Sequence, residues 1–486
     1  MPAADGVLLA DGRIVLASED YRRLADHLDL ALRRARRSGR AVLGSISVSL
    51  PAQVDPSAVA VSSRRPGEPW FCMEQPERGG RALAGIGEAI TLEGGGHDRF
   101  ATVAERWRSL SCDAVQDARA EIQGAGLIAA GGFAFAADGG SSPHWKGFSP
   151  ASLTVPDVSI ARGEVLGQRT VTLTLCALMS PDDTVSEALA GLERRLGELR
   201  AGSLGLIDPA PAGRFEISST MPPEHYEAAV ARAIELIRSS QLNKIVLARE
   251  VQVHAPGAHD PGDIFGVLRE AFPSCFVFCV GRGDATLIAA SPELLVRREG
   301  SRVSTLALAG STRRSADPAV DDYLGERLLR SEKDREEQAI VTRRIERMLR
   351  AHALWVTSTP EPTLVKVANI QHLATPIRAQ LTKPLEAIEL LELMHPTPAV
   401  GGEPATHALA LIPALEGLDR GWYAGPVGWT DAAGDGEFCV ALRCALLRGH
   451  VAHCYAGVGV VRDSDPQAEL AETEIKLDAL LPLLTG

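Results

Sequence analysis

Short apolar or alternating stretches recur in the second half of the chain. Residues 242–253, LNKIVLAREVQV, have the aliphatic and β-branched content of a buried strand. Similar stretches lie at residues 275–281, 285–291 and 293–308, and turn-rich pieces join several more between residues 425 and 461. Strands joined by short turns pair in antiparallel fashion, so the pattern predicts an α+β fold and not a doubly wound parallel sheet.

Apolar residues spaced three and four positions apart predict helices along the whole chain. We expect them at residues 21–37, 186–202, 224–240, 322–352 and 465–481. A segment rich in proline and glycine, residues 205–226, follows the second of these and indicates a boundary. We therefore divide the chain into residues 1–215 and residues 216–486, and no internal repeat is visible.

The composition is that of an ordinary globular protein. The chain has 486 residues, 45% hydrophobic and 23% charged, with a formal net charge of −12. This charge argues against nucleic acid or an anionic membrane as a partner, although local arginines or a metal ion still allow a small anionic substrate. The eight cysteines form no CxxC pair, and we expect a reducing, cytoplasmic location. The common phosphate-loop, serine-hydrolase and zinc-protease motifs are missing from the sequence.

Lys244 is unusual because it is a lysine. The chain has 50 basic residues, of which only residues 146, 244, 333, 366, 383 and 476 are lysine. Arginine effectively never loses its proton, whereas a desolvated lysine can, so a lysine here could be needed for its titration. From this stretch alone, a strand-end lysine with its head in water is the simpler interpretation.

The helix expected at residues 322–352 carries acids on its apolar face. Glu337, Val341, Ile345 and Met348 are spaced so that one carboxylate shares the buried stripe, and Asp334 joins it one turn earlier. Taken alone, an exposed, salt-bridged face explains this pattern as well.

The last helix repeats this arrangement. It is expected to begin with Asp465 as its cap, and Glu469, Glu472 and Lys476 then share one face with Leu480. An exposed face is again the simpler explanation for this helix by itself. Together, the two helices could hold Mg²⁺, which prefers one or two protein carboxylates and leaves room for an anionic ligand.

Three further features lie between these helices in sequence or beside them. Glu293 begins an expected strand, and Gly310 centres a turn that could offer backbone N–H groups. Arg443 falls inside the apolar segment CVALRCAL, which we expect to be a strand, and a guanidinium there needs an anionic partner. That partner could be a ligand or a structural glutamate.

Ten motifs, in this order, make the chain similar to the chorismate-utilising enzymes and, among them, to the isochorismate synthases. They are KIVLAR (244–249), SPELL (291–295), LAGSTRR (308–314), EKDREE (332–337), QHLATPI (371–377), HPTPAVGG (395–402), GWYAGPVGW (421–429), VALRCAL (440–446), YAGVGVV (455–461) and ETEIKL (472–477). The resemblance implies one large α+β unit of two stacked α/β halves with antiparallel sheets, in which residues 216–486 form the chorismate-binding catalytic region. It also implies a requirement for Mg²⁺ and an active site between the halves.

The resemblance implies that chorismate becomes isochorismate: water adds at C2 of the ring, the double bonds shift and hydroxide leaves C4. Lys244 matches the general base that deprotonates the water, and Glu293 matches the general acid at the leaving hydroxyl. The pKa of lysine in water is about 10.4 and that of glutamate is about 4.3. For these roles the pKa of Lys244 must therefore fall and the pKa of Glu293 must rise.

The remaining site residues are also assigned by the resemblance. Glu337 and Glu472 match the metal ligands, while Glu469 and Asp334 match residues that hold metal-bound water. Gly310, Ser311 and Lys476 match positions near the ring carboxylate. The enolpyruvyl carboxylate pocket is matched by Arg443, Tyr423 and Gly457, and His372 matches a histidine beside the ring.

Related activities remain as alternatives. Anthranilate-forming members usually carry a non-basic residue where Lys244 stands, and no Gly-x-Cys-x-Gly motif is present, so we expect no fused glutamine amidotransferase. Salicylate synthases, which go on to eliminate pyruvate, tend to have threonine where this chain has Ala399; this difference favours a synthase that stops at isochorismate. A non-catalytic paralogue that binds a small anion would lack a chemical residue, yet Lys244, Glu293 and both metal-ligand glutamates are present.

One position departs from the family pattern. Glu336 stands where many relatives have histidine, next to a residue that matches a metal ligand, and it makes the helix more acidic. The sequence leaves open the effect on metal affinity, the oligomeric state, and whether the product serves menaquinone, siderophore or salicylate synthesis.

Overall fold

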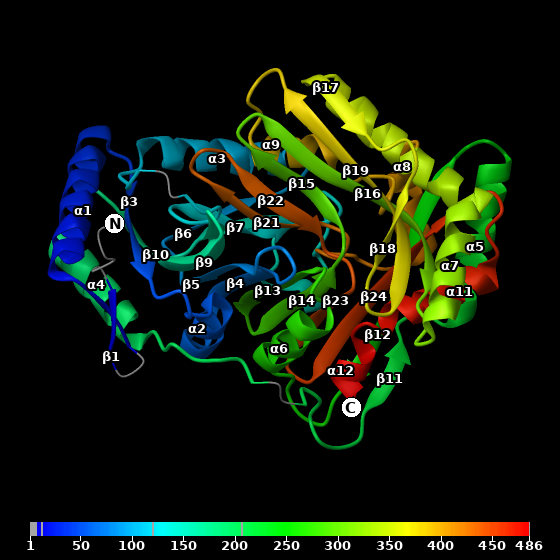
Figure 1. Cartoon of the computed structure of the whole chain (residues 1–486), viewed down its shortest axis with the longest axis horizontal. Helices are drawn as coiled ribbons and strands as arrows, with labels where there is room; N and C mark the ends of the chain where they lie inside the picture. The colour runs from blue at the N-terminus through cyan, green and yellow to red at the C-terminus, as the bar shows by residue number, and fades with distance from the viewer. Residues whose placement is uncertain (1–6, 11–12, 119–120, 206–207, 486) are drawn as a thin grey trace.

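Two large antiparallel sheets form the body of the protein. The computed structural model describes residues 7–10, 13–118, 121–205 and 208–485. The two sheets pack against each other through a shared apolar core, and helices lie at both ends of the molecule (Figure 1). The pairings between named strands in the described residues are antiparallel, which confirms the predicted α+β architecture.

The first sheet has twelve strands. In spatial order they are β11 (Glu216–Ser219), β12 (Lys244–His254), β24 (Val451–Val460), β23 (Cys444–Arg448), β14 (Ala285–Ser291), β13 (Phe276–Gly283), β4 (Gly67–Gln75), β5 (Arg81–Ile86), β9 (Val158–Val165), β10 (Gln168–Met179) and β3 (Val42–Leu50), with β20 (Gly402–Glu403) paired to β12. The expected boundary at residue 215 falls just before β11, and the sheet contains strands from both sides of it.

The second sheet has ten strands and also joins both parts of the sequence. In spatial order they are β17 (Ala353–Ser358), β19 (Ile370–Leu381), β16 (Arg302–Arg313), β15 (Leu294–Glu299), β22 (Gly436–Val440), β21 (Pro426–Asp431), β7 (Ile128–Phe133), β8 (Ala151–Val155) and β6 (Ile90–Gly94), with β18 (Thr363–Lys366) paired to β19. A separate hairpin is formed by β1 (Val7–Ala10) and β2 (Arg13–Leu16).

The helices cover the sheets. They are α1 (Ser18–Ser38), α2 (Pro56–Ser63), α3 (Arg99–Asp113), α4 (Val185–Glu198), α5 (Pro223–Arg238), α6 (Pro261–Ala271), α7 (Pro318–Arg330), α8 (Glu332–Arg350), α9 (Ala387–Met394), α10 (Ala405–Glu416), α11 (Pro466–Leu477) and α12 (Leu481–Thr485), together with the 3₁₀ turn η1 (Pro143–Trp145). None of the helices within the described ranges combines the length and the apolarity that crossing a membrane requires.

Two apolar cores hold these layers together. The larger one joins the sheets, because it contains Phe278 from the first sheet and Phe133 and Phe438 from the second. The other packs helices against the first sheet and includes Leu28 of α1 and Phe265 of α6. Burial of apolar area on both faces of the first sheet explains why several of its strands are apolar throughout instead of alternating.

The structure corrects two helix boundaries. The single helix predicted at residues 322–352 is wrong, because Ser331 has an extended backbone and separates α7 from α8. Its hydroxyl accepts a hydrogen bond from the Asp334 N–H at 3.3 Å, which caps α8 and competes with helix continuation. The last predicted helix does begin with Asp465 as its cap, but it ends at Leu477. In the expected boundary segment, residues 206–207 lie outside the described part.

Arg443 was expected inside a strand, and this is also wrong. Residues 441–443 connect β22 in the second sheet to β23 in the first, and Arg443 has a φ of +47°. The chain must turn here to change sheets, and its backbone bonds to the end of the neighbouring strand β14: the Ala290 N–H donates to the Arg443 carbonyl at 3.2 Å. The apolar pattern of the segment reflects burial and not strand conformation.

Candidate functional site

A cavity of about 710 Å³, including its open mouth, lies where the two sheets meet α8 and α11. Most residues singled out from the sequence are part of its wall: Glu293, Gly310, Ser311, Glu337, His372, Ala399, Tyr423, Arg443, Gly457, Glu472 and Lys476. Lys244, Asp334 and Glu469 are not in the wall. They lie close to it, as the following contacts show.

Lys244 is the first residue of β12, and its side chain is fully buried. Its Nζ lies 2.8 Å from Oε1 of Glu337, although the angle makes no directed hydrogen bond to any described residue. Gly459 of β24 is what leaves room for this pair: a Cβ there would lie 2.2 Å from Oε1 of Glu337 and 2.8 Å from Cε of Lys244. The interpretation of Lys244 as a solvated strand-end lysine is therefore wrong.

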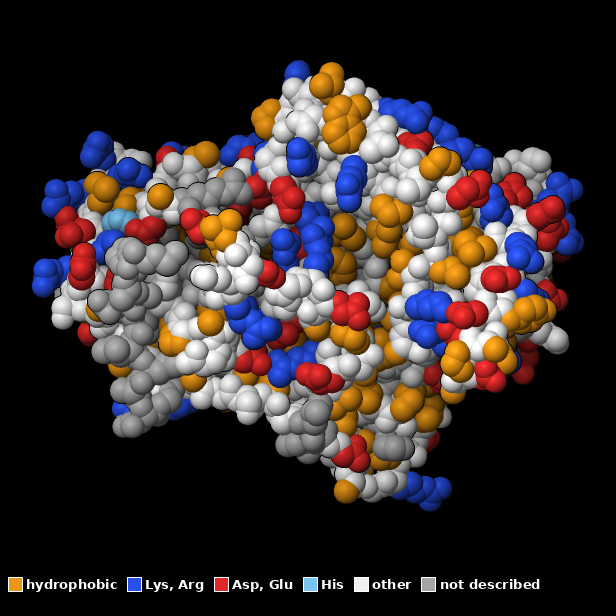
Figure 2. Space-filling model, in the orientation of Figure 1, with side chains coloured by type: hydrophobic (Ala, Val, Ile, Leu, Met, Phe, Trp, Pro, Cys, Tyr) orange, Lys and Arg blue, Asp and Glu red, His pale blue; other side chains and the backbone are white. Residues whose placement is uncertain are grey.

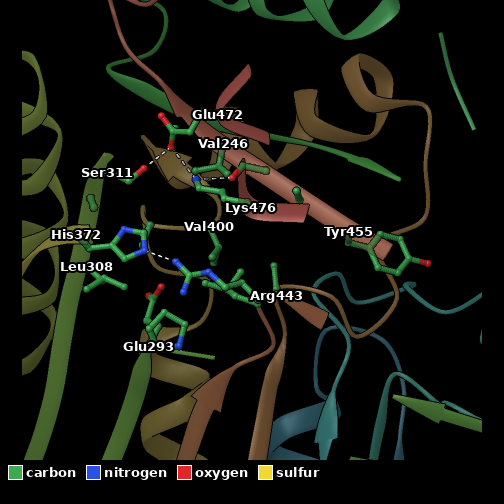
Figure 3. A pocket seen from close by; sticks show the side chains of 18 of the residues that line it. Val246, Glu293, Leu308, Ser311, His372, Val400, Arg443, Tyr455, Glu472 and Lys476 are labelled. Atoms are coloured by element: carbon green, nitrogen blue, oxygen red, sulfur yellow. Dashed lines mark hydrogen bonds and ion pairs between the residues drawn. The ribbon is translucent and has the colours of Figure 1, made fainter. Parts of the chain in front are cut away.

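Three carboxylates of α8 and α11 each pair with a lysine. Besides the pair just described, Glu469 Oε1 lies 2.7 Å from Lys333 Nζ and Glu472 Oε1 lies 2.9 Å from Lys476 Nζ. The Ser311 hydroxyl also donates to Glu472 at 2.5 Å, as Figure 3 shows. Since the Glu469 side chain is 2% exposed and that of Glu337 10%, the two helices do not present ordinary solvated, salt-bridged faces here.

The carboxylates also act on one another. Burial raises the pKa of Asp334, and the charges of Glu337 and Glu472 raise it further. Burial and the Glu472 charge likewise raise the pKa of Glu469. At Glu472 burial acts in the same direction, but Lys476, Ser311 and Lys333 hold the pKa below its usual value.

This donor set fits a magnesium ion. Carboxylate oxygens are the hard ligands that Mg²⁺ prefers, and mutual repulsion among them would be relieved by a cation. Within the described residues, no three of these carboxylates bring oxygens within 4.8 Å of one another. An ion that takes only one or two protein carboxylates and keeps open positions for other ligands suits this arrangement.

Glu293 lies at the point where the chain passes from β14 in the first sheet to β15 in the second. It is buried, and desolvation raises its pKa to about 8, against the opposing charges of Lys244 and Lys476. Glu293 is therefore mostly protonated at neutral pH and can give a proton to a group in the cavity.

Arg443 enters the cavity from the neighbouring crossing without an acidic partner. In Figure 3 its guanidinium meets the His372 ring, and Nη2 bonds to Nε2 of that histidine. Burial, followed by the charges of Arg443 and Lys476, lowers the pKa of His372 well below its usual value, so a neutral imidazole can accept this bond. Nη1 of Arg443 is buried with no partner among the described residues, and no described acid forms a salt bridge with it. No glutamate among the described residues therefore serves as a structural partner of Arg443, and its guanidinium is suited to bind an anionic ligand.

Two wall residues with polar side chains, Arg420 and Tyr455, were not predicted from the sequence. Arg420 forms a buried pair with Glu416, four residues earlier, and donates to the carbonyls of Val400 at 2.8 Å and Val246 at 2.9 Å. The i,i+4 spacing of the two charges was a signal that could have been noticed. Tyr455 also lines the cavity and stacks on Tyr423, with ring centroids 5.2 Å apart.

Lys333 and Glu336 lie beside the cavity, and Gly457 is part of its wall. Lys333 was recognisable only as one of the few lysines, and its contact with α11 could not be seen from spacing. Glu336, the departure from the family pattern, is exposed and does not line the cavity. At Gly457 a Cβ would lie 2.8 Å from the Tyr423 hydroxyl, so glycine there allows the tyrosine to approach β24.

A second hollow lies next to this cavity and is lined by charges of both signs. Its lining includes Arg78, Arg297, Arg378 and Glu77, and it shares Pro292 with the central cavity. Arg78 and Arg297 both pair with the buried Glu437. The surface view in Figure 2 shows a hollow near the middle of the face, with basic side chains beside hydrophobic ones.

Sequence comparison connects these features with known proteins. A profile of the family described as "Chorismate binding enzyme" matches residues 30–485. The chain is 35% identical over 478 residues to the "Salicylate biosynthesis isochorismate synthase" of Pseudomonas aeruginosa, covering 98% of this chain and 97% of that protein. It is 30% identical over 464 residues to "Isochorismate synthase MenF" of Bacillus subtilis, covering 94% of this chain and 96% of that protein.

Solved structures have the same fold. The menaquinone-specific isochorismate synthase MenF of Escherichia coli matches with a TM-score of 0.74 at 24% identity, covering 94% of this chain and all of that one. The crystal structure of DhbC from Bacillus anthracis matches with a TM-score of 0.68 at 28% identity, covering 87% of this chain and 98% of that one. The cavity, the fold and the nearly full-length matches lead to one conclusion: the chain belongs to the chorismate-binding enzyme family.

Proposed function

We propose that this protein is an isochorismate synthase, an isomerase that converts chorismate to isochorismate with the help of Mg²⁺. The observation that carries the proposal is the combination of a fully buried lysine, Lys244, with a buried glutamic acid, Glu293, whose pKa is about 8. The charge of Lys244 affects Glu293, yet the two form no ion pair, so each remains available for a separate proton transfer.

In this mechanism Lys244 takes a proton from a water molecule that attacks C2 of the ring. The ring double bonds shift, and the hydroxyl at C4 leaves as water with the proton that Glu293 gives. One water is added and one is lost, so the product is an isomer of the substrate. Lysine is required at residue 244 because arginine would keep the positive charge without the ability to act as a base.

The other wall residues hold the two carboxylates of chorismate. Arg443, with its free Nη1 and its bond to His372, would receive the enolpyruvyl carboxylate beside Tyr423 and Gly457. Lys476, Ser311 and the backbone at Gly310 would lie near the ring carboxylate. Buried cationic and N–H donors of this kind bind carboxylates strongly because water is excluded.

Glu337 and Glu472 would hold the magnesium ion, with Asp334 and Glu469 beside them. When bound, Mg²⁺ would supply Lewis-acid polarisation of the ring carboxylate. For Glu337 this role means exchanging its lysine partner for the metal, which would leave Lys244 free to meet the water.

The alternative is a salicylate synthase, which would form isochorismate and then eliminate pyruvate. Ala399 favours the simpler reaction: it lies in the cavity wall, where threonine in lyase-competent relatives would add a hydroxyl and a methyl group. The names of the relatives point in the same direction, although they belong to different pathways.

The base is tested by Lys244→Arg. We expect kcat to fall by at least about 100-fold, the lower range for loss of acid–base help. Arginine is larger and the site is fully buried, so Lys244→Met is made as well, and circular dichroism checks that both fold. Lys383→Arg, at an exposed lysine, is the control and should keep parental activity. Near-parental turnover of a folded Arg variant would exclude the proposed base.

The metal site is tested by chelation and by Glu337→Gln. EDTA should abolish the activity of the parent protein and added Mg²⁺ should restore it. The variant should lose at least about 100-fold in activity, and excess Mg²⁺ should recover little, because a ligand is missing as well as a charge. Its matched control is Glu336→Gln, at the exposed neighbouring residue. Full activity of the parent in EDTA would contradict the role of the ion.

The acid is tested by the pH dependence of kcat/KM, which reports the groups of the free enzyme. Glu293 must be protonated to act, so kcat/KM should fall as the pH rises through about 8. In Glu293→Gln this alkaline decline should disappear and the remaining kcat/KM should be lower at every pH. A parent profile that stays flat between pH 7 and 9.5, or the same decline in the variant, would show that another group donates the proton.

The product distinguishes the two synthases. Incubated with chorismate and Mg²⁺, the parent protein should release isochorismate with little salicylate or anthranilate, measured by chromatography. Ala399→Thr should raise the fraction of salicylate and pyruvate only in part, since a change of this size is worth about 1–3 kcal/mol of discrimination. Ala399→Val, which has the shape without the hydroxyl, separates the two contributions. Salicylate as the main product of the parent would favour the alternative.

A further inference from the structure

A second group of metal-ligating side chains lies outside the catalytic cavity. His144 of η1, Glu250 of β12 and His453 of β24 each bring one donor atom within 4.8 Å of the other two. Within the described residues, no other group of three or more His, Cys, Asp or Glu side chains has its donor atoms this close together. We propose that these three residues bind a divalent transition-metal ion of the zinc type.

The three side chains already contact one another. Nδ1 of His453 lies 2.8 Å from Oε1 of Glu250, and the rings of His144 and His453 stack with centroids 4.5 Å apart and planes 13° from parallel. Glu250 and His453 are buried, whereas His144 is half-buried. Two imidazoles thus lie beside a buried carboxylate and supply the ligand atoms. Because the nitrogen lone pairs lie in the ring planes, one of the two stacked rings must turn before both can bind the same ion.

This donor set is one that zinc uses. Two histidines and one glutamate supply three ligands and leave a fourth position open. Donor atoms around a tetrahedral zinc lie about 3.3 Å apart, given bonds of about 2.0–2.1 Å. The donor atoms lie within 4.8 Å of one another, so they must approach by up to about 1.5 Å, and the His144 ring must turn away from its stacked position. Rotation of the half-buried His144 side chain can supply both changes.

Neighbouring polar groups orient two of the ligands. The Tyr455 hydroxyl lies 3.1 Å from Nε2 of His144, and an interaction there leaves Nδ1 available for the ion. Gln252 donates from Nε2 to Oε1 of Glu250 at 2.9 Å. Such contacts to the outer side of metal ligands fix their orientation and contribute to metal affinity.

The position of the group suggests what an ion would do there. It would join η1, from the first 215 residues, to the two adjacent strands β12 and β24 of the catalytic region. Tyr455 connects the group to the cavity: its ring stacks on Trp145 and on Tyr423, and its hydroxyl points away from Glu472 and Lys476 in Figure 3. A bound ion would therefore stabilise the cavity wall from the side that faces away from the substrate, without contacting the substrate.

Zinc binding to the full-length protein tests the proposal independently of the enzymatic reaction. The protein is stripped with a chelator, dialysed against millimolar Mg²⁺ to saturate hard-ligand sites, and titrated with Zn²⁺. A Cys112→Ser background removes the one exposed thiol in the described residues. We expect one tight zinc equivalent, a tetrahedral absorption spectrum when Co²⁺ replaces zinc, and a Tm that rises with zinc concentration.

Single variants should remove this binding. In His144→Ala and in Glu250→Gln the zinc Kd should rise at least about tenfold, and the cobalt spectrum and the zinc-dependent rise in Tm should be lost. His450→Ala, at an exposed histidine in the turn between β23 and β24, is the matched control and should bind as the parent does. His144 is half-buried, so its variant keeps the test valid if Glu250→Gln does not fold. No tight zinc equivalent in the parent, or unchanged binding in a folded His144→Ala variant, would overturn the proposal.

Discussion

Two neighbouring crossings of the chain between the sheets determine where the central cavity lies. The chain passes from β14 to β15 and from β22 to β23, and these passages are bonded to each other. The Val440 N–H donates to the Glu293 carbonyl at 3.0 Å, and the Ser291 hydroxyl donates to the Val440 carbonyl at 2.5 Å. Because each crossing leaves one sheet for the other, its side chains lie between the layers. A buried acid and a buried guanidinium are thus held in one cavity by backbone hydrogen bonds.

Such a cavity is costly to build, since charged groups lose hydration when they are buried. The lysine–carboxylate pairs of α8 and α11 offset this cost in the absence of ligands. Lys244 with Glu337, Lys333 with Glu469 and Lys476 with Glu472 each neutralise one buried or half-buried acid. The same pairs are compatible with the proposed mechanism, in which a cation would replace a lysine at a carboxylate and release that lysine for another role. A site of fixed apolar packing could not make that exchange.

Small residues set how closely these groups approach. Gly459 admits the Lys244–Glu337 pair, and Gly457 admits the Tyr423 hydroxyl, because a Cβ at either position would collide with them. Arg420 then ties the cavity wall to the strand that carries Lys244, through the carbonyls of Val246 and Val400. The charged and polar groups are therefore positioned by backbone contacts, and by the absence of a side chain at these two glycines, as much as by their own bonds.

The sequence by itself determined the local features of this protein. Period-two and period-3.6 patterns predicted strands of the second half and the antiparallel α+β class, together with helices that correspond to α1, α4, α5, α7, α8 and α11, whereas α2, α3, α6, α9, α10 and α12 were not predicted. The spacing of Glu337 with Val341 and Ile345 placed a carboxylate on a buried face, as the structure has it. Lys244 stood out because lysine is rare among the basic residues of the chain. Only the tertiary structure decided that Lys244 is buried against Glu337, that Arg443 lies in a crossing instead of a strand, and that His144 meets Glu250 and His453. Periodicity reports which side of one element is buried, whereas these contacts depend on strand register and sheet order across segments up to about 300 residues apart, and no local pattern encodes that.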